Sequence, residues 1–534
     1  MGADVSFDGI AFRFPDKVDF TNLCVYDQRR DTLLFVTELV ARLDLFSISG
    51  KEIRFSRILL QEPDIRLRMD STRTFNSQFL LDAFKSPKKS SDGNKWALNF
   101  RDIEINNARL CIQTRPDSQF RVTSPGAIDF SNLSVTGLSL HINHLTLPDS
   151  GGVAFRIQKL SLREQSGFEI VHLSSGVLIH PRQILCDHLV LITPATTLAA
   201  DDCGLRFPSF KSLGEAFITD VRMSLHMERS TIALKDIGYF VPLFRPYPES
   251  VSFSGQVEGT VRDLKARDIV LRVGQSTVLR ADMEWSGLPD WRKTRFTLDF
   301  RELSTTPADL RRVRLPRQPQ EFMKLPEPAT RFTSISYTGT FIGYLDNFVT
   351  HGRVTSNLGS LVTDMSIRPV ISVRSDTTFM YSGTLETRQF QLGRLLDQPY
   401  LGGVTMKGSV QGSATRRGDV KAQVQGVINS LMIRDYEYQN IVLNGTVDNQ
   451  TYNGSLTVQD ENLEMDFLGT VDLSSGRVPR LQFSAAVGRA RLNKLNLARQ
   501  DTSAFASFQI TGDFTGAGID QLQGEMSLKD VVLT

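Results

Sequence analysis

Two groups of residues in this 534-residue chain have types and spacing that enzymes and metal sites use. His141 and His144 form an HxxH pair within "LHINHL", a pattern that can hold a metal ion on a helix. Glu464, Asp466 and Asp472 place three carboxylates close together in "LEMDFLGTVDL". Paired carboxylates can hydrolyse glycosidic bonds. Both patterns depend on the secondary structure that carries them.

On strands, both patterns favour a structural interpretation. Residues three apart on a strand point to opposite faces, so His141 and His144 cannot share an ion there. Glu464, Asp466 and Asp472 alternate with apolar residues, as the solvated face of a strand does. The chain also has no GxSxG, HExxH, GxGxxG, Walker or EF-hand spacing. The sequence therefore predicts a protein that is not an enzyme, with no catalytic residue, metal or cofactor.

The four cysteines are Cys24, Cys111, Cys186 and Cys203, too few for a disulfide framework. None has CxxC spacing, so buried free thiols are expected. A Cys186–Cys203 bridge is the alternative in an oxidising compartment.

Composition indicates a folded chain without a nucleic-acid partner. Hydrophobic residues make up 40% and charged residues 22%, and the net charge is only +2. The start, "MGADVSFDGI", lacks the features of a signal peptide, and no run of 18 apolar residues could form a transmembrane helix. The end, "MSLKDVVLT", resembles an interrupted strand. We therefore expect a fragment whose targeting and anchoring elements lie outside it.

Period-two alternation dominates the chain. In "LEMDFLGTVDL" (463–473), "AFASFQITGDF" (504–514) and "GVTMKGSVQGSA" (403–414), apolar and polar residues alternate. Such strands have one apolar and one solvated face, which is typical of antiparallel sheets. The sequence predicts a mainly β protein.

Helical signals are few and short. The segment 76–84 is expected to form a helix with Asn76 as its N-cap. One or two turns are expected at 305–313 and at 392–397. The proline-rich, basic segment 314–330 is expected to be a loop or linker. So few helices could not cover a large sheet.

A phrase of the form apolar–x–Gly–x–apolar recurs through the C-terminal half, as in "LNGTV" (443–447) and "YNGSL" (452–456). Glycine weakens a strand, and alternation places these glycines on the apolar face. There they could relieve crowding where a large sheet curls into a trough. Bulges in an ordinary sandwich core are the alternative. The candidate groove-shaping glycines are Gly339, Gly383, Gly408, Gly445, Gly454, Gly469 and Gly512.

The apolar face itself is the candidate functional site. Contiguous exposed apolar surface usually marks a binding site. A continuous apolar channel suits acyl chains, which gain roughly 0.8 kcal/mol per buried CH₂. The residues expected to line it are Leu456, Val458, Leu463, Met465, Phe467, Val471, Phe508, Ile510 and Phe514.

Several segments, in order, resemble the TamB proteins of the Bacteroidetes type, within the AsmA-like group. The first is 5–67, with "DTLLFV" followed by "IRFSRILLQEPDIRL". It is followed by 268–310, 337–367 and 381–396. The segment 436–473, "YEYQNIVLNGTVDNQTYNGSLTVQDENLEMDFLGTVDL", is the most similar. No single motif is specific, and the ordered set carries the resemblance.

The resemblance implies an elongated, curled, antiparallel-rich sheet forming a hydrophobic groove, known as a β-taco or repeating β-groove. Residues 1–245 would form an N-terminal, membrane-proximal AsmA-like β region. Residues 246–534 would form TamB-like β-groove repeats, truncated at the C-terminus. The resemblance implies that the anchor helix lies outside this chain and that the usual C-terminal domain lies beyond residue 534.

The resemblance also implies a function. The chain would be the periplasmic segment of an inner-membrane-anchored protein that carries phospholipid acyl chains along the groove toward the outer membrane. The alternative implied function is translocation or assembly of outer-membrane or secreted proteins with a barrel partner of the TamA or BamA type. There the exposed strand edge would act by β-augmentation. The partners implied are phospholipids, that barrel, and the inner membrane through the anchor helix.

A third interpretation is a β-rich extracellular enzyme or carbohydrate binder. It requires aromatic platforms on a solvated face. The three tryptophans, Trp96, Trp285 and Trp291, do not occupy repeated strand positions and give it little support.

Overall fold

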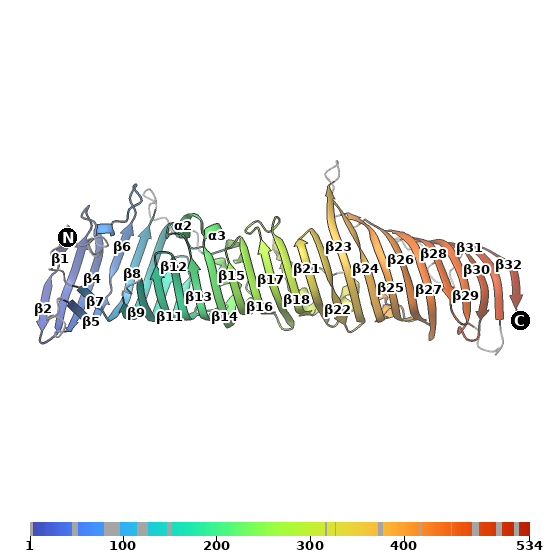
Figure 1. Cartoon of the computed structure of the whole chain (residues 1–534), viewed down its shortest axis with the longest axis horizontal. Coiled ribbons are helices and arrows are strands. Elements are labelled where there is room, and N and C mark those ends of the chain that lie inside the picture. The colour runs from blue at the N-terminus through green and yellow to red at the C-terminus, as the bar shows by residue number, and fades with distance from the viewer. Residues whose placement is uncertain are drawn as a thin grey trace. The chain divides into compact units, whose positions relative to one another are not determined.

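The computed structural model shows a mainly β protein with few, short helices, as the alternation predicts (Figure 1). It describes residues 4–44, 52–79, 97–114, 126–146, 152–315, 318–325, 327–371, 377–415, 419–449, 451–472, 480–497, 505–516 and 523–533. The chain forms two compact units: residues 1–274 with 314–321 (unit 1), and residues 275–313 with 322–534 (unit 2). The boundary expected at 245/246 falls inside unit 1.

Unit 1 is built on strands that follow one another along the chain. They are β1 (Val5–Ser6), β2 (Gly9–Arg13), β3 (Lys17–Tyr26), β4 (Thr32–Asp44), β5 (Glu52–Gln61), β6 (Asp64–Arg68), β7 (Ala97–Phe100), β8 (Asp102–Gln113), β9 (Asn132–Thr146), β10 (Val153–Glu164), β11 (Glu169–His180), β12 (Gln183–Ile192), β13 (Thr197–Arg206), β14 (Arg222–Ala233), β15 (Ser250–Gly259) and β16 (Asp263–Val273). From β8 onward each strand pairs antiparallel with the next.

Parallel pairing occurs near the start of unit 1. β5 and β6 are separated by Glu62 and Pro63, and both run parallel to β8. Proline has no amide hydrogen to donate to a neighbouring strand, and Glu62 has a φ of 50°. The chain therefore bends between β5 and β6. The carbonyl of Pro63 still accepts a hydrogen bond from the amide of Arg109, at 2.8 Å. A single strand, β8, thus aligns both β5 and β6.

Unit 2 is an antiparallel meander. Its strands are β17 (Thr277–Ser286), β18 (Arg295–Thr305), β21 (Ile335–Tyr344), β22 (Asn347–Ser356), β23 (Gly359–Ile371), β24 (Thr377–Gln391), β25 (Leu401–Thr415), β26 (Val420–Ile433), β27 (Tyr436–Asp448), β28 (Thr451–Gln459), β29 (Leu463–Asp472), β30 (Arg480–Arg491), β31 (Phe505–Thr515) and β32 (Gln523–Leu533). Each pairs with the next in this order.

Short helical turns connect some of these strands. α5 (Pro307–Leu310) and α6 (Leu392–Leu396) confirm the turns expected at 305–313 and 392–397. In α5 the hydroxyl of Thr306 accepts from the amide of Asp309, at 3.2 Å, as an N-cap does. The segment expected to be a loop at 314–330 instead contains paired strands, β19 (Arg314–Leu315) and β20 (Gln318–Phe322), and the 3₁₀ helix η3 (Glu327–Arg331).

The helix expected at 76–84 lies mostly outside the described residues, which end at Phe79. The prediction that Asn76 caps this helix is wrong. The side-chain oxygen of Asn76 accepts from the backbone amide of Arg68, at 3.0 Å, rather than from the first helical turn. Asn76 therefore stabilises a strand.

Glycines on the apolar side of unit 2 lie beneath aromatic rings. Tyr337 and Tyr452 each lie over the glycine two residues further on, Gly339 and Gly454, because a Cβ there would meet the hydroxyl at 2.8 and 2.5 Å. The Tyr452 hydroxyl donates to the carbonyl of Ser455, at 3.2 Å. At these two positions glycine leaves room for a ring over the backbone.

We predict that Gly454→Ala destabilises unit 2. The new Cβ would lie 2.4 Å from the carbonyl oxygen of Asn444 and 2.5 Å from the Tyr452 hydroxyl, so the neighbouring strand must shift. We expect a loss of about 1–3 kcal/mol in the free energy of unfolding, measured as a lower urea midpoint of the far-ultraviolet circular dichroism signal.

Gly488→Ala in β30 is the matched control. A Cβ there would meet only the side chain of Glu464, at 3.6 Å or more, so we expect a change within about 0.5 kcal/mol. Equal midpoints for the two variants would contradict the packing role of Gly454.

Candidate functional site

Strand register gathers apolar side chains of unit 2 into rows that cross the strands. One row contains Leu443, Leu456, Phe467, Ala485 and Ile510, each directly opposite the next. Because side chains alternate between faces, one further apolar row on the same face lies two residues away along each strand, and another lies four residues away, beyond a row that contains glycines. We call these three rows of β27–β31 the apolar face of unit 2.

The apolar face is half-buried, whereas the opposite face is exposed. Along β29 the residues Leu463, Met465 and Phe467 are partly buried, and Glu464, Asp466 and Leu468 between them are exposed. A face packed in a closed core would be buried throughout, since core side chains are surrounded on all sides. Much of the apolar face therefore remains accessible.

Eight of the nine predicted lining residues fall into these three rows, and the ninth, Leu463, lies opposite Ala490 beyond a register shift. Leu456, Phe467 and Ile510 belong to the row described above. A second row contains Val471 and Phe514, together with Val447, Tyr452 and Leu481. The third row contains Val458, Met465 and Phe508, together with Ile441 and Val487.

The third row is the closed margin of the face. Leu463, Met465 and Phe508 pack against a cluster of buried residues formed by Val487, Ala490, Leu495 and Ala506. Val458, in the same row, is itself only 3% exposed. Leu495 belongs to a turn that follows β30 and is 1% exposed. The accessible part of the face therefore lies nearer the other two rows.

The predicted glycines lie among these rows. Gly445, Gly454 and Gly469 are directly opposite one another, between the rows of Phe467 and Val471. Gly512 continues them beyond Phe483, and Gly383 lies opposite Val410. Gly408 lies opposite Gly426 in β26, and Gly339 opposite Gly352 in β22. These glycines lie on the same side of the sheet, and because glycine has no side chain, each of them contributes only its backbone to that side.

The sequence analysis missed the residues of β30. Phe483 stacks on Phe467, with ring centroids 5.4 Å apart, and lies 6.2 Å from the ring of Phe514. The alternation of Leu481, Phe483, Ala485 and Val487 in "LQFSAAV" was the signal that could have identified them.

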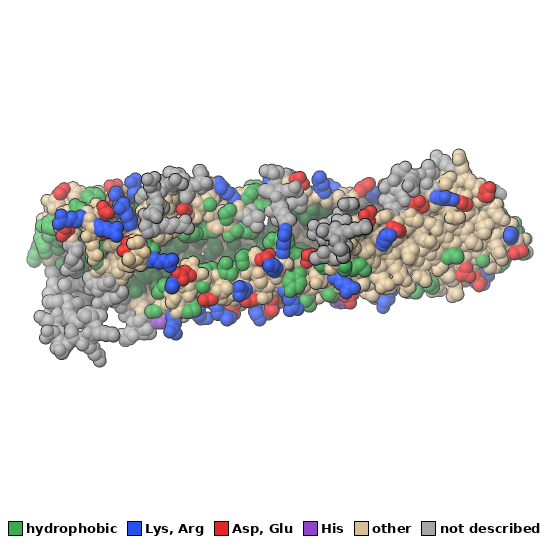
Figure 2. All heavy atoms as spheres, turned by 90° about the horizontal axis from the view of Figure 1, so that it is seen from above, with side chains coloured by type: hydrophobic (Ala, Val, Ile, Leu, Met, Phe, Trp, Pro, Cys, Tyr) green, Lys and Arg blue, Asp and Glu red, His purple; other side chains and the backbone are tan. Residues whose placement is uncertain are grey.

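Unit 1 has an apolar face of the same construction. Val177, Cys186, Cys203, Leu225 and Val257 form a cross-strand row over β11–β15. The adjoining residues Asp187 and Asp202 face the other way, opposite each other. Figure 2 shows a hollow lined with hydrophobic side chains over the stretch where Figure 1 places β12 to β16.

The candidate chemical groups occupy structural positions. His141 lies 2.8 Å from a carboxylate oxygen of Asp102, which is a pairing with one carboxylate. Asp466 and Asp472 accept hydrogen bonds from Thr457 and Thr451, at 2.9 and 3.1 Å. Among the described residues no group of three His, Cys, Asp or Glu side chains is placed to hold a metal ion. No helix in the described ranges has the length and hydropathy needed to cross a membrane.

A buried carboxylate stabilises the closed margin of unit 2. Asp460 is 5% exposed and accepts from the amides of Gln439 and Asn462, at 3.0 and 2.8 Å. It also accepts from the Tyr436 hydroxyl. Burial, together with this hydrogen bond to Asp460, raises the pKa of Tyr436 to about 12. The tyrosine therefore remains a hydrogen-bond donor at neutral pH.

Cys186 and Cys203 lie directly opposite each other in β12 and β13, and both are free thiols. The Cys203 thiol donates a hydrogen bond that lowers the pKa of Cys186 and raises the pKa of Cys203. The pair therefore shares one labile proton on the apolar face of unit 1.

Comparison of the chain with protein-family models, curated proteins and solved structures finds no match in any of the three.

We predict that alkylating reagents modify Cys186 faster than Cys203 near neutral pH, because the thiolate is the reactive form. Replacing Cys203 with Ala removes the hydrogen-bond donor, so the pKa of Cys186 should rise and its rate should fall. Mass spectrometry of peptides after timed treatment with iodoacetamide measures both rates. Cys111 is the internal control, and its rate should not change.

The lowered pKa of Cys186 also makes the stability of the fold depend on pH. An unperturbed thiol has a pKa near 8.5, so the ion form of Cys186 stabilises the fold fully above that pH. This contribution should be lost as the pH falls through the lower folded pKa of Cys186. Equal alkylation of Cys186 with and without Cys203 would contradict the hydrogen bond.

Proposed function

We propose that this protein is a non-enzymatic lipid carrier whose apolar faces hold the acyl chains of phospholipids. The observation that carries the proposal is the half-buried state of the cross-strand rows in unit 2, where Leu456, Phe467 and Ile510 form part of an extended apolar surface. Such a surface gains free energy when it is removed from water.

Acyl chains suit this surface better than compact ligands. The rows carry few polar groups, and the Tyr452 hydroxyl among them is bonded to the backbone. The attraction is therefore non-directional and similar at successive strands, so a bound chain can shift along the rows at little cost. The exposed face opposite, with Glu464 and Asp466, stays in water.

The resemblance to TamB proteins supplies the cellular setting of the proposal. The chain would be a periplasmic segment of a protein anchored in the inner membrane, and it would pass phospholipids toward the outer membrane. An outer-membrane barrel of the TamA or BamA type would be the partner there.

The first experiment is native mass spectrometry with lipid extraction on the chain purified from the periplasm of a Gram-negative host. We expect several phospholipids per chain for the wild type. Phe467→Asp and Ile510→Asp should each lower the number of phospholipids bound per chain by removing those held on the apolar face of unit 2, because a charge in an apolar site costs several kcal/mol.

Leu468→Asp is the matched control. Leu468 is next to Phe467 in β29 but lies on the opposite face and is 62% exposed. It should keep its lipid, and all three variants should keep the β signal in circular dichroism. A lipid-free wild type, or equal lipid in Phe467→Asp and Leu468→Asp, would contradict the carrier function. The assembly role with a barrel partner would then be favoured, and crosslinking of strand edges to a client strand would test it.

A further inference from the structure

A cavity of about 390 Å³ lies on the polar side of β6, β8 and β9 in unit 1. Its donors come from Arg66, Arg68, Arg109, Gln113, Ser134 and Thr136. The other side of the same strands is apolar, and there Leu110 packs against a buried cluster that includes Val135. The thickness of the sheet therefore separates the cavity from the apolar side of β8 and β9.

Parallel pairing brings these side chains together. Asp64, Arg66 and Arg68 lie directly opposite Arg109, Cys111 and Gln113. Cys111 in turn lies opposite Ser134 of β9. Alternate residues share a face, so all of them point to the polar side.

The lining has an excess of positive charge. Three guanidinium groups face one carboxylate, that of Asp64, which pairs with Arg66 at 2.7 Å. Arg68 pairs with Asp31 at 3.3 Å. Within the described part of the chain, the exposed guanidinium of Arg109 makes no ion pair. Guanidinium groups bind carboxylates and phosphates through two parallel hydrogen bonds, so Arg109 is available for an anion.

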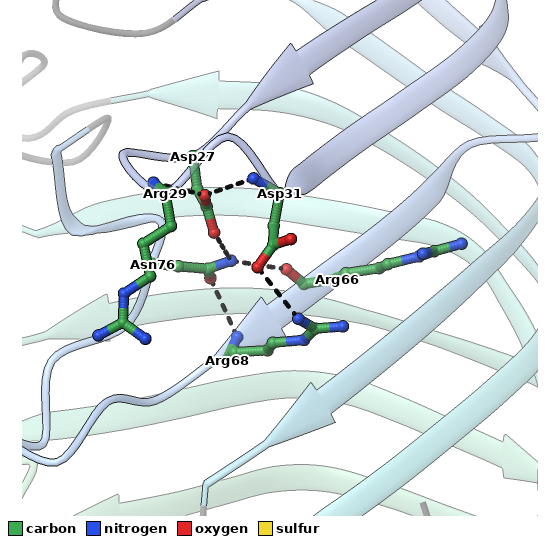
Figure 3. Close-up of polar contacts among 6 residues, drawn as sticks. All are labelled: Asp27, Arg29, Asp31, Arg66, Arg68 and Asn76. Carbon is green, nitrogen blue, oxygen red and sulfur yellow. Dashed lines mark hydrogen bonds and ion pairs between the residues drawn. The ribbon is translucent and has the colours of Figure 1, made fainter. Parts of the chain in front are cut away.

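Hydrogen bonds hold the strand that carries two of these arginines (Figure 3). The Asn76 side chain accepts from the amide of Arg68, at 3.0 Å, and donates to the carbonyl of Arg66, at 3.2 Å. It also donates to Asp27, at 3.0 Å.

Asp27 is 6% exposed and accepts from the amides of Arg29 and Asp31, both at 2.9 Å. The turn that carries Asp31 and the edge of β6 are thus tied together. The backbone positions of Arg66 and Arg68 are therefore fixed before any ligand binds, which reduces the entropy lost on binding.

We propose that this cavity binds a phosphate ester. Its volume lies within the range of small-ligand sites, so it accommodates a phosphate with an attached group such as glycerol. The guanidinium groups would hold the phosphate oxygens, while Gln113, Ser134 and Thr136 would donate to the attached group. The ester would come either from a phospholipid headgroup or from a soluble phosphorylated compound. The proposal does not rest on the lipid-carrier function, because the cavity lies on the polar side of β6, β8 and β9, opposite the apolar side of the same strands.

Titration calorimetry of the whole chain at low salt tests the proposal, with glycerol 3-phosphate and inorganic phosphate as soluble probes. Flotation with phosphatidylcholine vesicles, with and without phosphatidic acid, tests the membrane source. We expect saturable binding of glycerol 3-phosphate or selective flotation with phosphatidic acid. Arg109→Gln should weaken it about tenfold, the loss of one charge-assisted contact, and Arg66→Gln with Arg109→Gln further.

Arg301→Gln is the control. Arg301 lies on β18 of unit 2 and is ion-paired with Asp282, and its side chain is 50% exposed, against 45% for Arg66. Binding of the soluble probe that is lost in the Arg66 and Arg109 variants alone supports a site for phosphorylated compounds. Flotation lost in the same variants supports a headgroup site. No binding of any probe, or equal loss in Arg301→Gln, would overturn the proposal.

Discussion

The register of neighbouring strands is the constraint on which the rest of this structure depends. A slip of one residue moves every side chain of a strand to the other face. In unit 2 the register holds over long stretches, as between β27, β28 and β29, where Leu443, Leu456 and Phe467 stay aligned. This alignment brings the apolar residues of successive strands side by side in rows. Together these rows form the apolar face.

Glycine and aromatic residues make that alignment compatible with dense packing. An open sheet face has no second layer to fill, so bulky residues must find room beside the backbone. Tyr452 does so over Gly454, and Tyr337 over Gly339. The hydroxyl groups of Tyr452 and Tyr337 then donate to the backbone carbonyls of Ser455 and Thr340. The glycines thus lower the strand propensity of the sequence, but they make room for the tyrosine rings.

Alternation in the sequence was sufficient to predict the β class. It could not predict which part of the face is closed, because Leu463 and Met465 are covered by a turn around Leu495 that has no periodic signal. It also could not predict the cavity on the polar side of β6, β8 and β9. Asp64 and Arg109 are opposite each other only because β6 runs parallel to β8, and that order depends on pairing between distant segments. Asn76 was assigned to a helix because capping residues and turn residues are the same types.

The meander in each unit has a further consequence. Among the described residues of unit 2, each strand is bonded only to the strands before and after it in the pairing order, so its contribution depends on its nearest neighbours, as in repeat proteins. Inserting or deleting one hairpin would leave the local chemistry of the remaining strands unchanged. The distance covered by such a face can therefore change in steps of two strands, so its length can evolve independently of its selectivity.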